Sequence, residues 1–173
     1  PRLALPLDLP EPYRRLLELV DANASRLDVA GTLDLLTESG LAAEFDDLFR
    51  HAADLGLSVD VVAAIVLARL LGGPLGEFLS GDAQVALASL QKRAREATDA
   101  LREMGRHGIA LARLSQEPVA REVLRQRSDG EALERFARMR ELLDHLDDAV
   151  RRSGESLQHE RARHAHREGG AIA

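Results

Sequence analysis

The chain has 173 residues, of which 45% are hydrophobic and only 3% aromatic, and it contains neither cysteine nor tryptophan. The lack of cysteine excludes a disulfide scaffold, thiolate zinc sites, iron–sulfur clusters and cysteine nucleophiles. The net charge of −6 is divided unevenly, because residues 1–90 carry 6 Lys/Arg against 14 Asp/Glu and residues 91–173 carry 17 against 15. The abundance of alanine, leucine and charged residues predicts a helical protein and not a disordered one.

The chain is predicted to begin with an extended segment and then to form short helices. Residues 1–12 contain four prolines, which favour extended backbone because proline fixes φ and donates no hydrogen bond. Ser25 and Asp28 resemble a capping box, which would open a second helix that ends near Gly40. The first helix, which follows Pro12, has an apolar stripe at helical spacing, formed by Tyr13, Leu16, Leu17 and Val20.

Two further helices complete the acidic part of the predicted domain, residues 13–80. One is expected from about Leu41 to Leu55 and ends before Gly56. Ser58 is placed to cap the next, Val59 to Leu71, which is apolar on nearly every side. Its β-branched residues would also suit a strand, but no second strand candidate exists to pair with it. We therefore interpret this segment as a buried central helix.

Residues 82–153 are predicted to form a long antiparallel helical hairpin with two heptad-like seams. Asp82 would cap the first long helix, and Glu131 would open the second after a turn at residues 128–130. A shorter helix is expected between them, from Pro118. The first seam is rich in small residues and consists of Ala83, Leu87, Leu90, Ala94, Ala97, Leu101, Met104 and Gly108. The second is bulkier and consists of Ala132, Phe136, Met139, Leu143, Leu146 and Val150, with Leu157 on its extension.

The two seams allow two arrangements. Small residues facing bulky ones permit close helix packing, so the seams can lie directly against each other. Alternatively, each seam faces a common core. In either case we expect an all-α fold of six or seven helices, with a single helical domain over residues 13–153.

Residues 154–173 are polar and contain several arginines and histidines, so we expect a fraying helix followed by disorder. The first residues lack the 7–15-residue apolar stretch of a secretory signal. The longest apolar run, residues 61–71, is shorter than the roughly 20 residues that a bilayer span needs. A cytoplasmic location is therefore expected.

Two stripes of carboxylates and imidazoles are candidate metal ligands. Such mixed ligand sets suit Mn, Fe or Zn, and two stripes that met inside a bundle would form a dinuclear site. The Glu-x-x-His spacing of di-iron bundles is absent, however, and both stripes lie off the apolar helix faces. We interpret them as solvated surface and assign no metal, cofactor or catalytic residue. The stripes are Glu44, Asp47, His51 and Asp54, and Glu141, His145 and Asp148.

Three other motifs carry weaker signals. Residues 105–108, Gly-Arg-His-Gly, are expected to interrupt a long helix, either as a simple kink or so that Arg106 and His107 face an anion. In the tail, His159 and His164 are five residues apart, and a zincin motif needs a spacing of four. Residues 28–60 contain eight acidic residues and one arginine, which argues against DNA binding through this segment.

We expect a non-enzymatic helical interaction or regulatory protein that self-associates, as a homodimer, and whose acidic part docks a basic protein partner. One alternative is a helical sensor domain for a small ligand, metal or cofactor. Helix 59–71 would then form the pocket wall and residues 105–108 the mouth. Another alternative is an accessory protein that binds nucleic acid or a membrane surface through Arg161, Arg163, Arg167 and the tail histidines.

Overall fold

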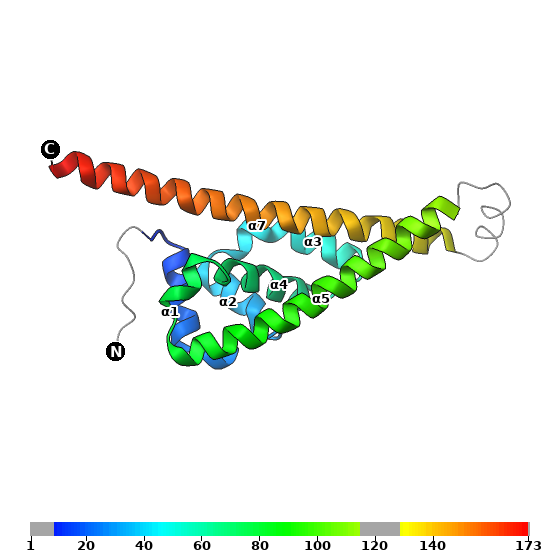
Figure 1. Cartoon of the computed structure of the whole chain (residues 1–173), viewed down its shortest axis with the longest axis horizontal. Helices are drawn as coiled ribbons and strands as arrows, with labels where there is room; N and C mark the ends of the chain where they lie inside the picture. Colours follow the sequence, from blue (N-terminus) through cyan, green and yellow to red (C-terminus); the bar gives the residue numbers. More distant parts are fainter. Residues whose placement is uncertain (1–8, 115–128, 173) are drawn as a thin grey trace.

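The computed structural model describes residues 9–114 and 129–172, and within these residues the fold is all-α, without a strand (Figure 1). None of the helices described there is long and apolar enough to cross a membrane. In chain order the elements are α1 (Tyr13–Ala22), η1 (Ala24–Arg26), α2 (Thr32–Ser39), η2 (Ala42–Phe45), α3 (Asp46–Asp54), α4 (Val59–Leu71), η3 (Pro74–Phe78), α5 (Gly81–Leu114) and α7 (Asp129–Ile172), where η denotes a 3-10 helix.

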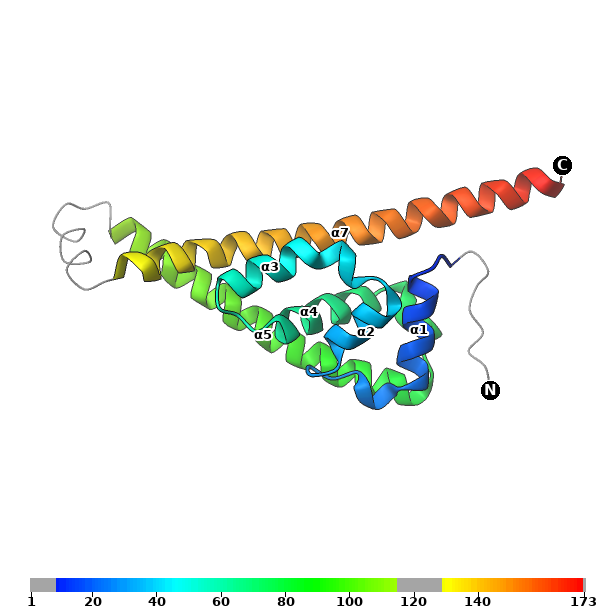
Figure 2. The ribbon, with the colours of Figure 1, turned by 180° about the vertical axis from the view of Figure 1, so that it is seen from behind.

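The two long helices, α5 and α7, form the frame of the molecule. They run in opposite directions and lie closest near the end of α5 and the start of α7 (Figure 1). From there they diverge, and α1 to α4 lie between them, as the view from behind also shows (Figure 2). The C-terminal part of α7 continues past α1 and beyond the rest of the described chain. The body of the protein is therefore a wedge of short helices between two long ones.

Helix α4 lies at the centre of the core. A helix that is apolar on all sides must be covered all round, and α2, α3, α5 and α7 all contact α4. The prediction of a buried central helix is confirmed. Ser58 occupies the N-cap position, but its side chain makes no capping hydrogen bond. The buried residues of α4 are Val62, Ala63, Ala64, Ile65, Val66, Leu67, Ala68, Leu70 and Leu71.

The second helix begins later than predicted. It starts at Thr32, because the Asp28 carboxylate accepts a hydrogen bond from the Gly31 backbone N–H at 2.8 Å and so closes a turn. Ser25 lies in η1 and caps no helix. A Cβ at Gly31 would lie 2.1 Å from the Arg26 carbonyl oxygen, so this turn requires glycine.

The ends of the next helices follow the sequence more closely. Gly40, with a φ of 89°, ends α2, and Gly56, with a φ of 74°, follows α3. Both glycines adopt the left-handed conformation that favours helix termination, as predicted. The predicted helix from Leu41 to Leu55 begins as the 3-10 turn η2 and becomes α-helical only at Asp46.

Helix α5 is continuous from Gly81 to Leu114, so the predicted interruption at residues 105–108 is wrong. Its seam is buried at Ala83, Leu87, Leu90, Ala94 and Leu101, as expected. At the next position the seam shifts by one residue, because Met104 is 37% exposed and Gly105 is buried. A Cβ at Gly105 would lie 3.8 Å from the backbone nitrogen of Arg140, so α5 and α7 approach closely there. Ala94, by contrast, lines a cavity with residues of α4.

The seams therefore combine the two predicted arrangements. The first half of the α5 seam faces the common core, and the second half meets α7. On the described part of α7 the buried apolar residues are Met139, Leu142, Leu143, Leu146 and Ala149, a wider face than the predicted seam. The structure does not describe the segment of the predicted short helix from Pro118. It also does not describe the side chains of Ala132 and Phe136 or the burial of Gly108.

Helix α7 extends much further than predicted. It starts at Asp129, inside the expected turn, and continues to Ile172, so the expected fraying and disorder after Gly154 are wrong. Across the Ser153–Gly154 step, Arg151 pairs with Glu155 at 2.8 Å, four residues ahead. Pairs at this spacing support a helix that has little tertiary packing.

A buried polar contact fixes α7 to the N-terminal part. The Tyr13 hydroxyl donates to the Ser153 carbonyl oxygen at 3.0 Å and lies 2.6 Å from the Ser153 hydroxyl. That hydroxyl in turn donates to the Glu44 carboxylate at 3.2 Å. Both Tyr13 and Ser153 are only 3% exposed, so the hydrogen bonds between these two residues form away from water, whereas Glu44 lies at the exposed end of the network. They join α1, η2 and α7 at one point.

Leu146 tests whether the core holds α7 in place. Its side chain is fully buried, so Leu146→Ala should lower the free energy of unfolding by about 2–5 kcal/mol through lost burial and a cavity. Chemical denaturation followed by circular dichroism measures this loss. The matched control is Val85→Ala on α5, where Val85 is 74% exposed and the change should be near zero. Equal effects of the two variants would show that α7 does not pack as described.

Tyr13 makes the stability sensitive to alkaline pH. Burial raises the pKa of its phenol, the Ser153 hydrogen bond lowers it by less, and the Glu44 carboxylate adds to the rise. The unfolded chain therefore ionises first, near pH 10, and stability is complete below that pH and declines as pH rises above it.

The variant that tests this is Tyr13→Phe, which should show a weaker decline between about pH 9 and pH 11. At neutral pH it should lose about 1–2 kcal/mol, because the Ser153 carbonyl loses a buried donor. Tyr13 is the single tyrosine of the chain, so tyrosinate absorbance reports its ionisation directly. Identical alkaline unfolding of the two proteins would contradict the assignment.

Candidate functional site

A cavity of about 310 Å³ lies between α4 and α5. Its apolar surface comes from Ile65, Ala68 and Ala94, and its polar surface is dominated by arginine. The remaining lining residues are Arg69, Gln91, Arg95, Thr98, Asp99 and Arg102. The volume is at the lower end of the range for small-ligand sites, and an apolar wall with a few polar groups is typical of them.

A second cavity of the same volume, about 310 Å³, lies between α5 and α7. Arg102 lines both cavities, so the two are neighbours along α5. We refer to the two together as the arginine groove. The other residues of the second cavity are Gly105, Arg106, Arg140, Leu143, Asp144 and Asp147.

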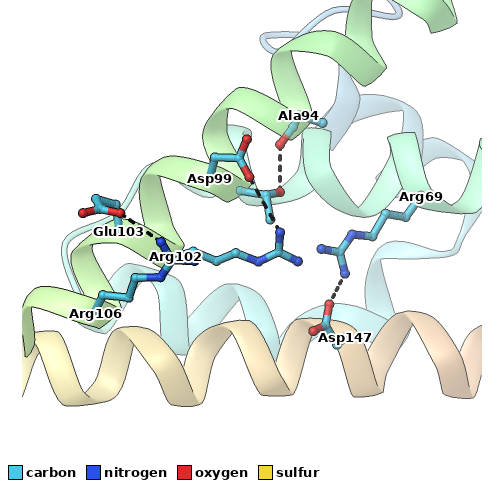
Figure 3. A network of polar contacts seen from close by, with 8 residues as sticks. Arg69, Ala94, Asp99, Arg102, Glu103, Arg106 and Asp147 are labelled. Atoms are coloured by element: carbon cyan, nitrogen blue, oxygen red, sulfur yellow. Dashed lines mark hydrogen bonds and ion pairs between the residues drawn. The ribbon is translucent and has the colours of Figure 1, made fainter. Parts of the chain in front are cut away.

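Arg69 and Arg102 dominate the groove. They extend from α4 and α5, and their guanidinium groups point toward one another (Figure 3). Arg69 is ion-paired with Asp147 of α7, and Arg102 with Asp99 at 3.7 Å, which is long for an ion pair. Two like charges that converge on one cavity repel each other unless an anion lies between them.

The groove carries an excess of positive charge in an acidic protein. Its two cavities together are lined by five arginines and three aspartates, whereas the chain as a whole has a net charge of −6. Arg106 pairs with Glu103 at 3.4 Å, outside the groove lining. Within the part of the chain that is described, Arg95 and Arg140 have no ion pair. The groove is thus a local electropositive site.

The sequence hypotheses anticipated this region only in part. Helix α4 does form a pocket wall, and Gly105 and Arg106 do line a cavity, but they do so in an unbroken helix. The structure does not describe the side chain of His107. Asp147 lies four residues before Arg151, a spacing that allows an ion pair along the helix, but it pairs with Arg69 of α4. Arg69 stands out as the single charge in an apolar run, and that was the available signal for the groove.

The two candidate metal stripes meet at one pair of residues. The rings of His51 on α3 and His145 on α7 lie 6.2 Å apart between centroids, at an interplanar angle of 38°. The Nε2 atom of His51 is buried and has no hydrogen-bond partner. A protein zinc site has three or four ligands, and nowhere in the described residues do three His, Asp or Glu side chains gather to hold a metal.

The remaining stripe residues are used for structure or face solvent. Glu44 accepts the Ser153 hydroxyl, and Asp47 pairs with Arg50 at 2.8 Å. Asp148 pairs with Arg151 and Arg152, and the hydrogen bond from Arg151 lowers the pKa of the Asp148 carboxyl. The side chains of Asp54 and Glu141 are exposed.

Helix α7 contains several acidic residues that are followed by an arginine four residues later, a spacing that supports a helix, and Asp148–Arg152 forms such an ion pair at 3.1 Å. Two others, Glu131–Arg135 and Glu134–Arg138, involve side chains that the structure does not describe.

The far end of α7 presents a different surface. His159, Arg163, His166 and Arg167 lie on one helix face, together with Ala162, and all are exposed. We call these residues the basic face of the arm, where the arm is residues 155–172 of α7. On this face Arg163 pairs with Glu160 of the same helix. The acidic surface of residues 28–60 is equally exposed: all eight of its carboxylates face solvent.

Neither the groove nor the arm gains an assignment from similarity, because no family model matches the chain and no curated protein or solved structure matches it either.

Proposed function

We propose that the protein is a non-enzymatic helical interaction protein that self-associates through the arm of α7. The observation that carries the proposal is the exposed basic face of His159, Arg163, His166 and Arg167, on a helix that extends past the body. A long exposed helix with one charged face gains little stability by itself, and its charges are available to a partner.

The partner that fits best is a second copy of this chain. Residues 28–60 carry eight exposed carboxylates against one arginine, so the body of one copy is complementary in charge to the arm of another. Two copies related by a twofold axis can each lay the arm on the partner's acidic surface. A closed dimer of this kind satisfies both arms and leaves no open end for further growth.

Charge reversal tests the proposal. The wild-type chain at about 50 μM should elute as a dimer in size-exclusion chromatography with light scattering at about 50 mM NaCl, and it should dissociate at about 500 mM NaCl. Arg163→Glu together with Arg167→Glu should give a monomer at low salt. A strict wild-type monomer would overturn the proposal.

The matched control is Lys92→Glu with Arg93→Glu on α5, which changes the net charge equally at exposed positions off the arm. It should remain dimeric. If both double variants dissociate alike, net charge and not the arm controls association.

The same preparations mixed with a short DNA duplex test the nucleic-acid alternative. Salt-sensitive binding that requires Arg163 and Arg167, with no dimer, would favour that alternative.

A further inference from the structure

We propose that the arginine groove is a binding site for the phosphate group of a small organic phosphate monoester. Arg69 and Arg102 hold the phosphate between them, and the organic part lies on the apolar wall formed by Ile65, Ala68 and Ala94. This site is separate from the arm, so it is independent of self-association.

The geometry of the two arginines favours phosphate over other anions. Guanidinium groups present planar forks of N–H donors, and each fork bonds two oxygens of one anion. A carboxylate presents only two oxygens in one plane, and a single fork engages both of them. A phosphate monoester has three terminal oxygens, and so it can accept from two guanidiniums that approach from different helices, as Arg69 and Arg102 do (Figure 3).

The charge of the cavity also fits this ligand. Three arginines and one aspartate line the cavity between α4 and α5, and Asp147 of α7 pairs with Arg69, so these groups together carry a net charge of +1. A phosphate monoester carries about −1.5 to −2 at pH 7. Binding would therefore place an anion between Arg69 and Arg102 and offset the repulsion between them.

The arginines can reach a ligand without disturbing the fold. The side chain of Arg69 is 29% exposed and that of Arg102 is 54% exposed, so both remain accessible from solvent. Arg69 can keep its pair with Asp147 through one nitrogen and donate to a ligand through others, because the guanidinium has five donors. The Arg102–Asp99 pair, at 3.7 Å between exposed groups, is weak and readily replaced.

The apolar wall should make the site bind an organic phosphate more tightly than inorganic phosphate. Ile65, Ala68 and Ala94 belong to the core and are only 1%, 5% and 6% exposed, so the apolar gain comes mainly from the ligand's own organic group, which leaves water when it lies against them. A compact aromatic ester is small enough for a cavity of about 310 Å³. Phenyl phosphate is therefore a suitable probe, with phenol and inorganic phosphate as its two halves.

Isothermal titration calorimetry of the full chain at constant ionic strength tests the proposal. Phenyl phosphate should bind measurably, inorganic phosphate at least several-fold more weakly, and phenol not detectably. Arg102→Met should weaken phenyl phosphate binding at least about tenfold, because a charge-assisted fork is lost. Asp99→Asn should tighten it between about 1.5- and 5-fold, because a competing carboxylate is removed.

Matched controls lie on the same helix outside the groove. Arg93→Met and Glu96→Gln make the same charge changes at exposed positions and should leave the affinity unchanged. If Arg102→Met and Arg93→Met weaken binding equally, the effect is one of net charge and the site assignment fails. Equal binding of phenyl and inorganic phosphate, or no binding of either, would also overturn it. A dimer that survives Arg102→Met would show that the groove and the arm act independently.

Discussion

The requirement to bury α4 on every side organises this protein. An apolar helix without a polar face has no orientation that leaves it at the surface, so other helices must surround it. The short helices α2 and α3 cover part of α4, and the long helices α5 and α7 cover the rest. The wedge shape follows, because α5 and α7 must diverge to admit the helices between them (Figure 1).

The same requirement creates the arginine groove. Arg69 is the one cation in α4, and its side chain, 29% exposed, extends from the buried helix toward α5 and α7. There it meets Asp147 on α7 and faces Arg102 on α5. A charge that is forced to the edge of a core by its apolar neighbours is held in place by packing, and a binding site needs groups held in this way. Helix α4, which organises the core, and the proposed binding site therefore share one residue, Arg69.

The arm of α7, unlike Arg69, is not held in place by core packing. Up to Ser153 the helix is held by buried leucines and by the hydrogen bonds to Tyr13 and Glu44. Beyond that point short-range ion pairs such as Arg151–Glu155 support it, and among the described residues Leu157 is the last that packs partly on the core. A helix that continues without core contacts is helped by such pairs, and it carries a cationic face away from the body (Figure 1).

Much of the fold could be predicted from the sequence, because hydrophobic periodicity and glycine positions act locally. The all-α class, the buried helix 59–71 and the left-handed glycines at 40 and 56 depend on residues that are close in the chain. Prediction from the sequence failed where one local signal was compatible with two structures. Asp28 was equally suited to cap a helix or a turn, and Gly105 was equally suited to break α5 or to admit α7 closely. Most carboxylates of the candidate stripes are exposed, but whether His51 would meet His145 depended on how α3 lies on α7.

The sequence by itself determined which helix must be central and where the charges concentrate, since composition and spacing are properties of the chain alone. Only the tertiary structure decided that Arg69, Arg102 and Asp147 meet, because they come from three helices separated by up to 78 residues and no local pattern links them. Long-range contacts depend on how helices cross, and crossing is set by the packing of the whole core and not by any one segment.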